Sequence, residues 1–156
     1  MSSKRFLLVC ALASVAATGC TPGAAVAPNA NHAAGSSAII IGMSLIKYGQ
    51  APSPFGTVQA YNPAFTTVPV GSTIQFHNDD GFNHTATMIG GSFPASNQFQ
   101  TAALTPSGTS LASPGWSTGD LVSNSFSQTF AASTPGMYLY GCAHHYPAMR
   151  GVIIVQ

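Results

Sequence analysis

The sequence predicts an all-β domain, an antiparallel Greek-key sandwich of about seven or eight short strands. Three observations lead to this prediction. Gly (16) and Pro (11) are frequent, which favours many turns. Short stretches alternate between apolar and polar residues with a period of two, which is typical of strands with one buried face. A chain of 156 residues is long enough for one domain with its own core.

The first half of the chain contains four stretches with strand periodicity. The expected strands are residues 38–46, 57–61, 73–78 and 85–89. In residues 38–46, every second residue is large and apolar, so one face is buried. In residues 73–78, Ile74 and Phe76 point inward between polar neighbours, and the acidic turn after this strand places His84 in a loop at the end of a sheet.

The second half begins with a long irregular segment, residues 90–119, which we call the insert. It is rich in small and polar residues, and we expect one short helix near residues 102–104. Trp116 is interpreted as the packing anchor of the insert. Phe126 and Phe130 are expected to share one face of the next strand. The remaining expected strands are residues 125–130, 137–142 and 151–155.

Few residues are charged, only 4% of the chain. Outside the N-terminal segment, two cations, Lys47 and Arg150, stand against three aspartates. So few charges cannot form a basic stripe, which argues against nucleic-acid binding. They also exclude strong long-range steering of a charged partner.

The N-terminus has the pattern of a signal peptide over residues 1–20. Lys4 and Arg5 precede a short apolar run that is too short to span a bilayer comfortably. The run ends in Ala-Thr-Gly before Cys20, which resembles the lipobox of bacterial lipoproteins and implies lipidation of Cys20. The alternative is ordinary cleavage near residues 25–27.

Residues 21–37 are rich in Ala, Pro, Asn and Gly without periodicity, which indicates a flexible tether. The folded domain is then expected over residues 38–156. We therefore expect an exported protein, periplasmic or on the cell surface, held at the membrane only by a lipid on Cys20.

Soft and borderline metal ligands gather in the last part of the chain. Cys142, His145 and Met149 lie within the stretch YLYGCAHHYPAMRG, and Cys142 is the only cysteine left in the expected domain. A thiolate, an imidazole and a thioether are the donors that select copper. A centre with one thiolate and two imidazoles needs a second histidine, and His84 is the obvious supplier. The sequence therefore predicts one copper ion as cofactor.

These motifs resemble the cupredoxins, the type 1 blue copper proteins of the plastocyanin, pseudoazurin and amicyanin group. The strand Tyr-x-Tyr-x-Cys, then x-x-His, then a Met, matches the family pattern at Cys142, His145 and Met149. The run Phe-x-Asn-x-Asp-x-x-x-His ending at His84 matches its upstream half. The spacing from His145 to Met149 lies between that of amicyanin and that of plastocyanin, so no subfamily is assigned.

The resemblance implies a role for each residue. Cys142, His84 and His145 are the equatorial ligands and Met149 is the weak axial ligand, whereas His144 is disfavoured because the family places two residues between Cys and His. Asn78 is expected to hold the loop of His84, and a backbone N–H near Thr85 to donate to the thiolate. The expected electron-port patch, an exposed apolar surface at the second histidine, consists of Phe82, Tyr146, Pro147 and Ala148. Ordinary loop packing is an equal alternative for these four residues.

Three functions compete. The first is a monomeric electron carrier between extracytoplasmic redox proteins, without enzymatic activity. The second is a copper-binding protein that delivers or buffers the ion, although delivery sites usually expose His and Met clusters. The third is an enzyme of the nitrite-reductase or multicopper-oxidase type, which would need a second copper centre. The complete donor set favours the carrier.

Overall fold

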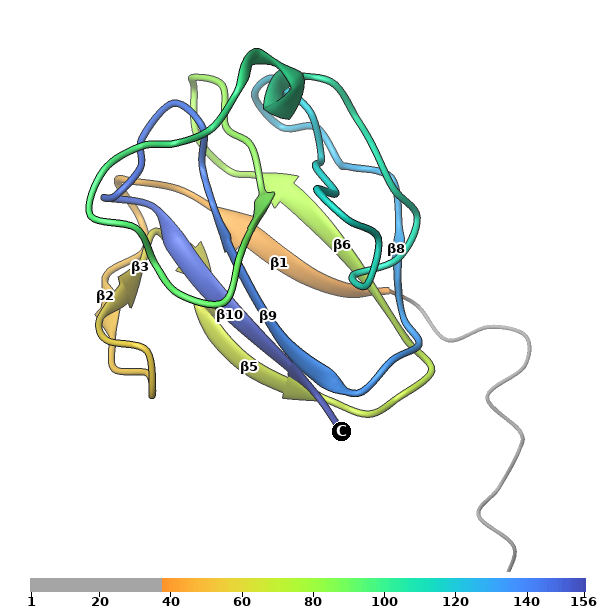
Figure 1. Ribbon diagram of the computed structural model, residues 1–156. Helices are drawn as coiled ribbons and strands as arrows, with labels where there is room; N and C mark the ends of the chain where they lie inside the picture. Colours follow the sequence, from red (N-terminus) through yellow and green to blue (C-terminus); the bar gives the residue numbers. More distant parts are fainter. Residues whose placement is uncertain (1–37) are drawn as a thin grey trace, which may run out of the picture. The chain divides into compact units, whose positions relative to one another are not determined.

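The computed structural model describes residues 38–156, and this part of the chain is a sandwich of two β-sheets (Figure 1). Its strands are β1 Ile39–Met43, β2 Gln50–Ala51, β3 Val58–Gln59, β4 Tyr61–Asn62, β5 Phe65–Val68, β6 Ser72–Asn78, β7 Thr87–Ile89, β8 Phe130–Ala132, β9 Gly136–Gly141 and β10 Arg150–Val155. One sheet has the order β4-β1-β6-β8, and the other has the order β2-β3-β10-β9-β7 with β5 also paired to β10. The predicted all-β sandwich is therefore confirmed.

Two details differ from the sequence prediction. The residues described form ten strands, because β2 and β5 lie outside the expected stretches and residues 57–61 form two strands instead of one. The sheets are also not wholly antiparallel, since β1 pairs with β6 and β5 pairs with β10 in parallel. Both parallel pairs arise because the chain crosses to the other sheet and then returns to the first sheet, next to the earlier strand.

The expected strands 38–46 and 85–89 are shorter in the structure, as β1 and β7, and two others differ more. The stretch 57–61 is divided into β3 and β4 at Ala60, whose φ of 66° breaks the extended backbone. The stretch 125–130 joins the sheet as β8 only from Phe130 onward. Phe130 is fully buried, but Phe126 is 54% exposed and lies against the ring of His77, so the two phenylalanines do not share a face.

The pairing of β9 with β10 sets the position of the loop between them. These strands are antiparallel, with Arg150 opposite Gly141 and Gly151 opposite Tyr140. The ladder is extended by a hydrogen bond from the Cys142 N–H to the Met149 carbonyl, 3.2 Å. Residues 142–149, which we call the ligand loop, are therefore held at both ends by two paired strands.

A cluster of large aromatic side chains fills the space between the sheets. The Trp116 ring is fully buried and stacks on Phe76, with centroids 5.9 Å apart. Tyr140 meets Phe76 and Tyr61 edge to face, at 5.3 and 4.8 Å between centroids. The interpretation of Trp116 as the anchor of the insert agrees with this burial.

The insert contains one turn of 3-10 helix, η1 Thr101–Leu104, close to the expected position. Figure 1 shows η1, the loop after β6 and the ligand loop at the same end of the domain. The backbone of His84 pairs with Leu121, which ties the loop after β6 to the segment that follows the insert. Three segments that are far apart in sequence are thereby brought together.

The predicted signal peptide (residues 1–20), the tether (residues 21–37) and the lipidation site Cys20 lie outside the described residues. Within residues 38–156, no helix has the length and hydrophobicity needed to cross a membrane.

Candidate metal centre

His84 is fixed by its backbone and by a buried amide. Its N–H donates to the Leu121 carbonyl and its carbonyl accepts from the Leu121 N–H, at 3.1 and 2.8 Å. Asn78, fully buried at the end of β6, donates through Nδ2 to the carbonyls of Phe82 and Leu121 at 2.9 and 2.8 Å. Asn78 thus holds the loop that carries His84, in the manner expected from the sequence.

The ligand loop is also bonded internally. The Tyr146 N–H donates to the Cys142 carbonyl at 2.9 Å, and the Met149 N–H donates to the His145 carbonyl at 3.1 Å. These bonds turn the chain tightly, so that Cys142 and His145 face the same point. Met149 returns the chain to β10 directly beside Cys142.

Three donor atoms from the two loops meet. His84 Nδ1 and His145 Nδ1 are 3.1 Å apart, and Cys142 Sγ lies 3.8 and 3.5 Å from them. A point equidistant from the corners of this triangle lies about 2.0 Å from each atom, which is close to the 2.0–2.3 Å that imidazole nitrogen and thiolate sulfur keep from bound zinc. The structure therefore provides room for one metal ion between the three atoms.

The centre is buried, with one ring reaching the surface. The side chains of His84, Cys142 and Met149 are inaccessible to solvent, while His145 is half-buried. Among residues 38–156, these two histidines and Cys142 form the one cluster of His, Cys and acidic groups that could hold a metal. One sulfur and two imidazoles suit copper, and Met149, whose side chain is buried, bonds through its backbone to Cys142 and His145.

Comparison with known proteins agrees with this donor set. A sequence profile of copper binding proteins of the plastocyanin/azurin family matches residues 55–156. The chain belongs to this family. Its cofactor is copper, as the sequence predicted.

Solved structures with a similar fold include other cupredoxins. A reduced amicyanin variant shares 18% identity and a TM-score of 0.51, over 78% of this chain and 85% of that chain. A purple cupredoxin from Nitrosopumilus maritimus shares 21% identity and a TM-score of 0.49, over 77% of this chain and 100% of that one. A copper-containing nitrite reductase from Thermus scotoductus SA-01 shares 25% identity and a TM-score of 0.44, over 62% of this chain and 20% of that one. No curated protein matches the chain.

The sulfur of this cupredoxin receives a backbone hydrogen bond. The Thr85 N–H donates to Cys142 Sγ at 3.3 Å, as expected from the sequence, and Thr85 Oγ1 accepts from the Ala143 N–H at 2.8 Å. Burial raises the pKa of the Cys142 thiol, and the Thr85 N–H opposes that rise. A bound cation would therefore be needed to keep the sulfur as a thiolate in this dry position.

A buried carboxylate orients the His84 ring. Asp80 Oδ2 lies 2.8 Å from His84 Nε2, the nitrogen that faces away from the triangle. The same carboxylate accepts hydrogen bonds from the Ser44 hydroxyl and from the Leu45 N–H. Burial alone would raise the pKa of Asp80, but the hydrogen bonds from Ser44 and His84 hold it below its usual value. An ionised Asp80 keeps a proton on Nε2, which leaves the Nδ1 lone pair free for a metal.

Sequence reasoning missed this role of Asp80. The sequence places Asp80 in an acidic turn and in the Phe-x-Asn-x-Asp-x-x-x-His run, four residues before His84, but neither pattern shows that its carboxylate contacts the His84 ring. That spacing becomes informative only once the turn geometry is known.

The expected electron-port patch is divided in the structure. Phe82 is 39% exposed and its ring lies 5.5 Å from that of His145, while Pro147 and Ala148 are exposed. Tyr146 does not belong to this surface, because it is only 7% exposed. The insert covers it: the Tyr146 hydroxyl donates to the Pro94 carbonyl, and Phe99 packs edge to face on its ring.

The two adjacent histidines of the ligand loop point to different partners. His145 faces Cys142, and burial and the nearby His84 lower its pKa, which favours the neutral ring that a metal requires. His144 is exposed and its Nε2 lies 2.8 Å from Asp120 Oδ1. Its ring is therefore engaged outside the donor triangle.

Proposed function

We propose that this cupredoxin is a type 1 (blue) copper protein that carries single electrons and is not an enzyme. The observation that supports this most strongly is the buried triangle of His84 Nδ1, His145 Nδ1 and Cys142 Sγ. Met149 is buried on the same loop, and its carbonyl accepts a hydrogen bond from the Cys142 N–H. Copper bound there would supply a one-electron couple between Cu(I) and Cu(II). We assign the equatorial positions to the two histidines and Cys142, and the weak axial position to Met149.

The chain contributes to electron transfer by keeping the donors in place. His84 is held by Leu121 and Asp80, and Cys142 and Met149 end paired strands. Donors that cannot move far on oxidation or reduction keep the reorganisation energy small, which favours rapid transfer.

The proposed port for electrons is the exposed edge of His145. It is the one half-buried residue among the four proposed ligands, and the exposed Phe82 ring lies beside it. A buried centre with one ring at the surface allows an electron to pass through that ring. It leaves no open coordination position on the metal for a substrate. This favours a carrier over an enzyme, and over a delivery protein that must release its ion.

The cellular setting proposed here comes from the sequence. We propose a signal peptide over residues 1–20, a lipid on Cys20, a tether over residues 21–37 and a monomeric cupredoxin domain over residues 38–156. The proposed partners are redox proteins outside the cytoplasm. Export also suits a single buried cysteine, since Cys142 has no partner for a disulfide among the described residues.

Visible absorption of the copper-loaded, oxidised full-length chain tests the proposal. We expect a strong band at about 600 nm that a reductant bleaches reversibly, because thiolate-to-copper charge transfer gives this colour. Cys142→Ser should abolish the band, whereas His144→Ala should leave it nearly intact. A colourless copper complex of the unmodified chain would refute the blue-copper assignment, and loss of colour in His144→Ala would refute the choice of His145.

A further inference from the structure

Asp120 connects the two loops that carry the proposed histidine ligands. Its Oδ1 lies 2.8 Å from His144 Nε2, and its Oδ2 accepts a hydrogen bond from Asn83 Nδ2 at 2.7 Å. His144 directly precedes His145, and Asn83 directly precedes His84. One carboxylate thus bridges the neighbours of both ligands, at the surface of the site.

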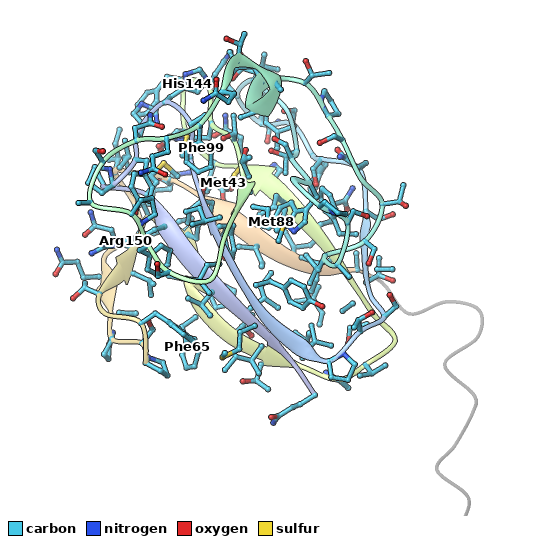
Figure 2. All side chains as sticks on the ribbon, in the orientation of Figure 1. Met43, Phe65, Met88, Phe99, His144 and Arg150 are labelled. Carbon is cyan, nitrogen blue, oxygen red and sulfur yellow. The ribbon has the colours of Figure 1, made fainter. Side chains whose placement is uncertain are left out.

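The insert contacts the ligand loop at two further points. Asn97 Nδ2 donates to the Ala143 carbonyl at 2.6 Å. The Tyr146 hydroxyl donates to the Pro94 carbonyl, and the Phe99 and Tyr146 rings meet edge to face with centroids 5.8 Å apart. Figure 2 shows Phe99 of the insert at the same end of the domain as His144.

The part of the ligand loop that needs such support is its middle. Cys142 and Met149 continue the ladder of β9 and β10, but residues 143–148 form turns instead of strand. His145 sits in these turns and is the proposed ligand that reaches the surface. A ligand on a turn is positioned less strictly than one at the end of a strand, unless other segments hold it.

We propose that the insert and Asp120 form a clamp that positions His145 before a metal binds, with Asp120 and Asn97 as positioning residues. The clamp holds Ala143 and His144 on one side of His145 and Tyr146 on the other. It also turns His144 outward, so that only one of the two adjacent histidines faces Cys142. This rests on the proposed role of His145 as a ligand, and it assigns a function to the insert.

The experiment compares five full-length variants with the unmodified chain. Asp120→Ala removes the contacts with His144 and Asn83, Asn97→Ala removes the hydrogen bond to the Ala143 carbonyl, and the double variant removes all three. Asp79→Ala is the matched control, because it also removes one carboxylate and one His–Asp pair, that with His77 at 2.8 Å, away from the ligand loop. His144→Ala removes a single surface contact, so it serves as a second test if Asp120→Ala does not fold.

The first measurement is hydrogen exchange in the metal-free protein. The Tyr146 and Met149 amides are hydrogen-bonded within the loop and report its order. Because one exposed contact contributes little, we expect roughly three-fold faster exchange at these two amides in each single variant and roughly ten-fold in the double variant. The exchange rates of amides in the β9–β10 ladder should stay the same in all variants. In the Asp79→Ala control, the exchange rates of the Tyr146 and Met149 amides should also stay the same.

The second measurement is the rate at which a chelator removes Cu(II). The rate of copper loss should rise by the same factors in Asp120→Ala, Asn97→Ala and the double variant. The position of the blue band should change little in His144→Ala. Unchanged exchange and unchanged copper loss in the double variant would overturn the clamp. If the unmodified chain shows no blue band, the proposed function fails, but exchange in the metal-free loop still decides whether the clamp exists.

Discussion

At the scale of single residues, the candidate centre depends on neighbours as much as on its donors. His84 reaches the donor triangle through Nδ1 because its Nε2 faces the buried Asp80 carboxylate, 2.8 Å away. The donors themselves could be predicted from the sequence, since His84, Cys142, His145 and Met149 occur in a characteristic order. Asp80 could not, because its contact depends on how the turn after β6 folds.

Replacing Asp80 with Asn should weaken copper binding roughly 10- to 100-fold, as is typical when a partner of a metal-bound histidine is changed. An amide that donates to His84 Nε2 would favour the proton on Nδ1, the atom that faces the triangle. Competition with a copper chelator measures the change. Asp79→Asn, which lies one residue away and does not contact His84, is the control, and equal affinities of the two variants would contradict this role of Asp80.

Tyr48 gives a prediction at alkaline pH. Burial and the hydrogen bond from its hydroxyl to Asp79, 2.7 Å, raise the pKa of Tyr48 to about 12. Between pH 10 and about 12 the folded chain keeps a proton that the unfolded chain loses, so the free energy of unfolding falls as pH rises through this window. Chemical denaturation across this range should show a smaller fall in Tyr48→Phe. An equal fall in both proteins would count against the raised pKa.

At the scale of elements, the hairpin of β9 and β10 determines where the ligand loop lies. The alternation of Tyr138, Tyr140 and Cys142 correctly indicated β9, and its pairing with β10 places Cys142 and Met149 side by side. The division of residues 57–61 could not be foreseen, because the positive φ of Ala60 leaves no mark on the residue pattern. The burial of Tyr146 was missed because it depends on the path of the insert.

Gly151 in β10 should not accept a side chain. A Cβ at this position would overlap the ring and the hydroxyl of the buried Tyr140, whose ring cannot move freely in the aromatic core. We therefore expect Gly151→Ala to lower the free energy of unfolding by about 1–3 kcal/mol, the usual cost of overpacking. Denaturant titration measures this, with Gly49→Ala, which has open space, as the control. A loss of unfolding free energy no larger than that of Gly49→Ala would contradict the prediction, because it would mean that the Tyr140 ring moves to make room for the added Cβ.

At the scale of the whole domain, two sheets support one site at one end (Figure 1). The all-β class followed from alternation and turn-forming residues, which are local signals. The parallel pairing of β1 with β6 and of β5 with β10 was missed, because the path of a chain between two sheets is not encoded in any single stretch. The course of the insert is equally non-local, since it depends on Trp116 packing against Phe76.

The central claim is that donors from two distant loops bind one copper ion together. X-ray absorption at the copper edge of the loaded full-length chain tests it most directly. We predict one sulfur and two nitrogen neighbours at roughly 2.0–2.3 Å, with the sulfur lost in Cys142→Ser and one nitrogen lost in His84→Ala. A copper environment of nitrogen and oxygen only, unchanged by either substitution, would contradict the account.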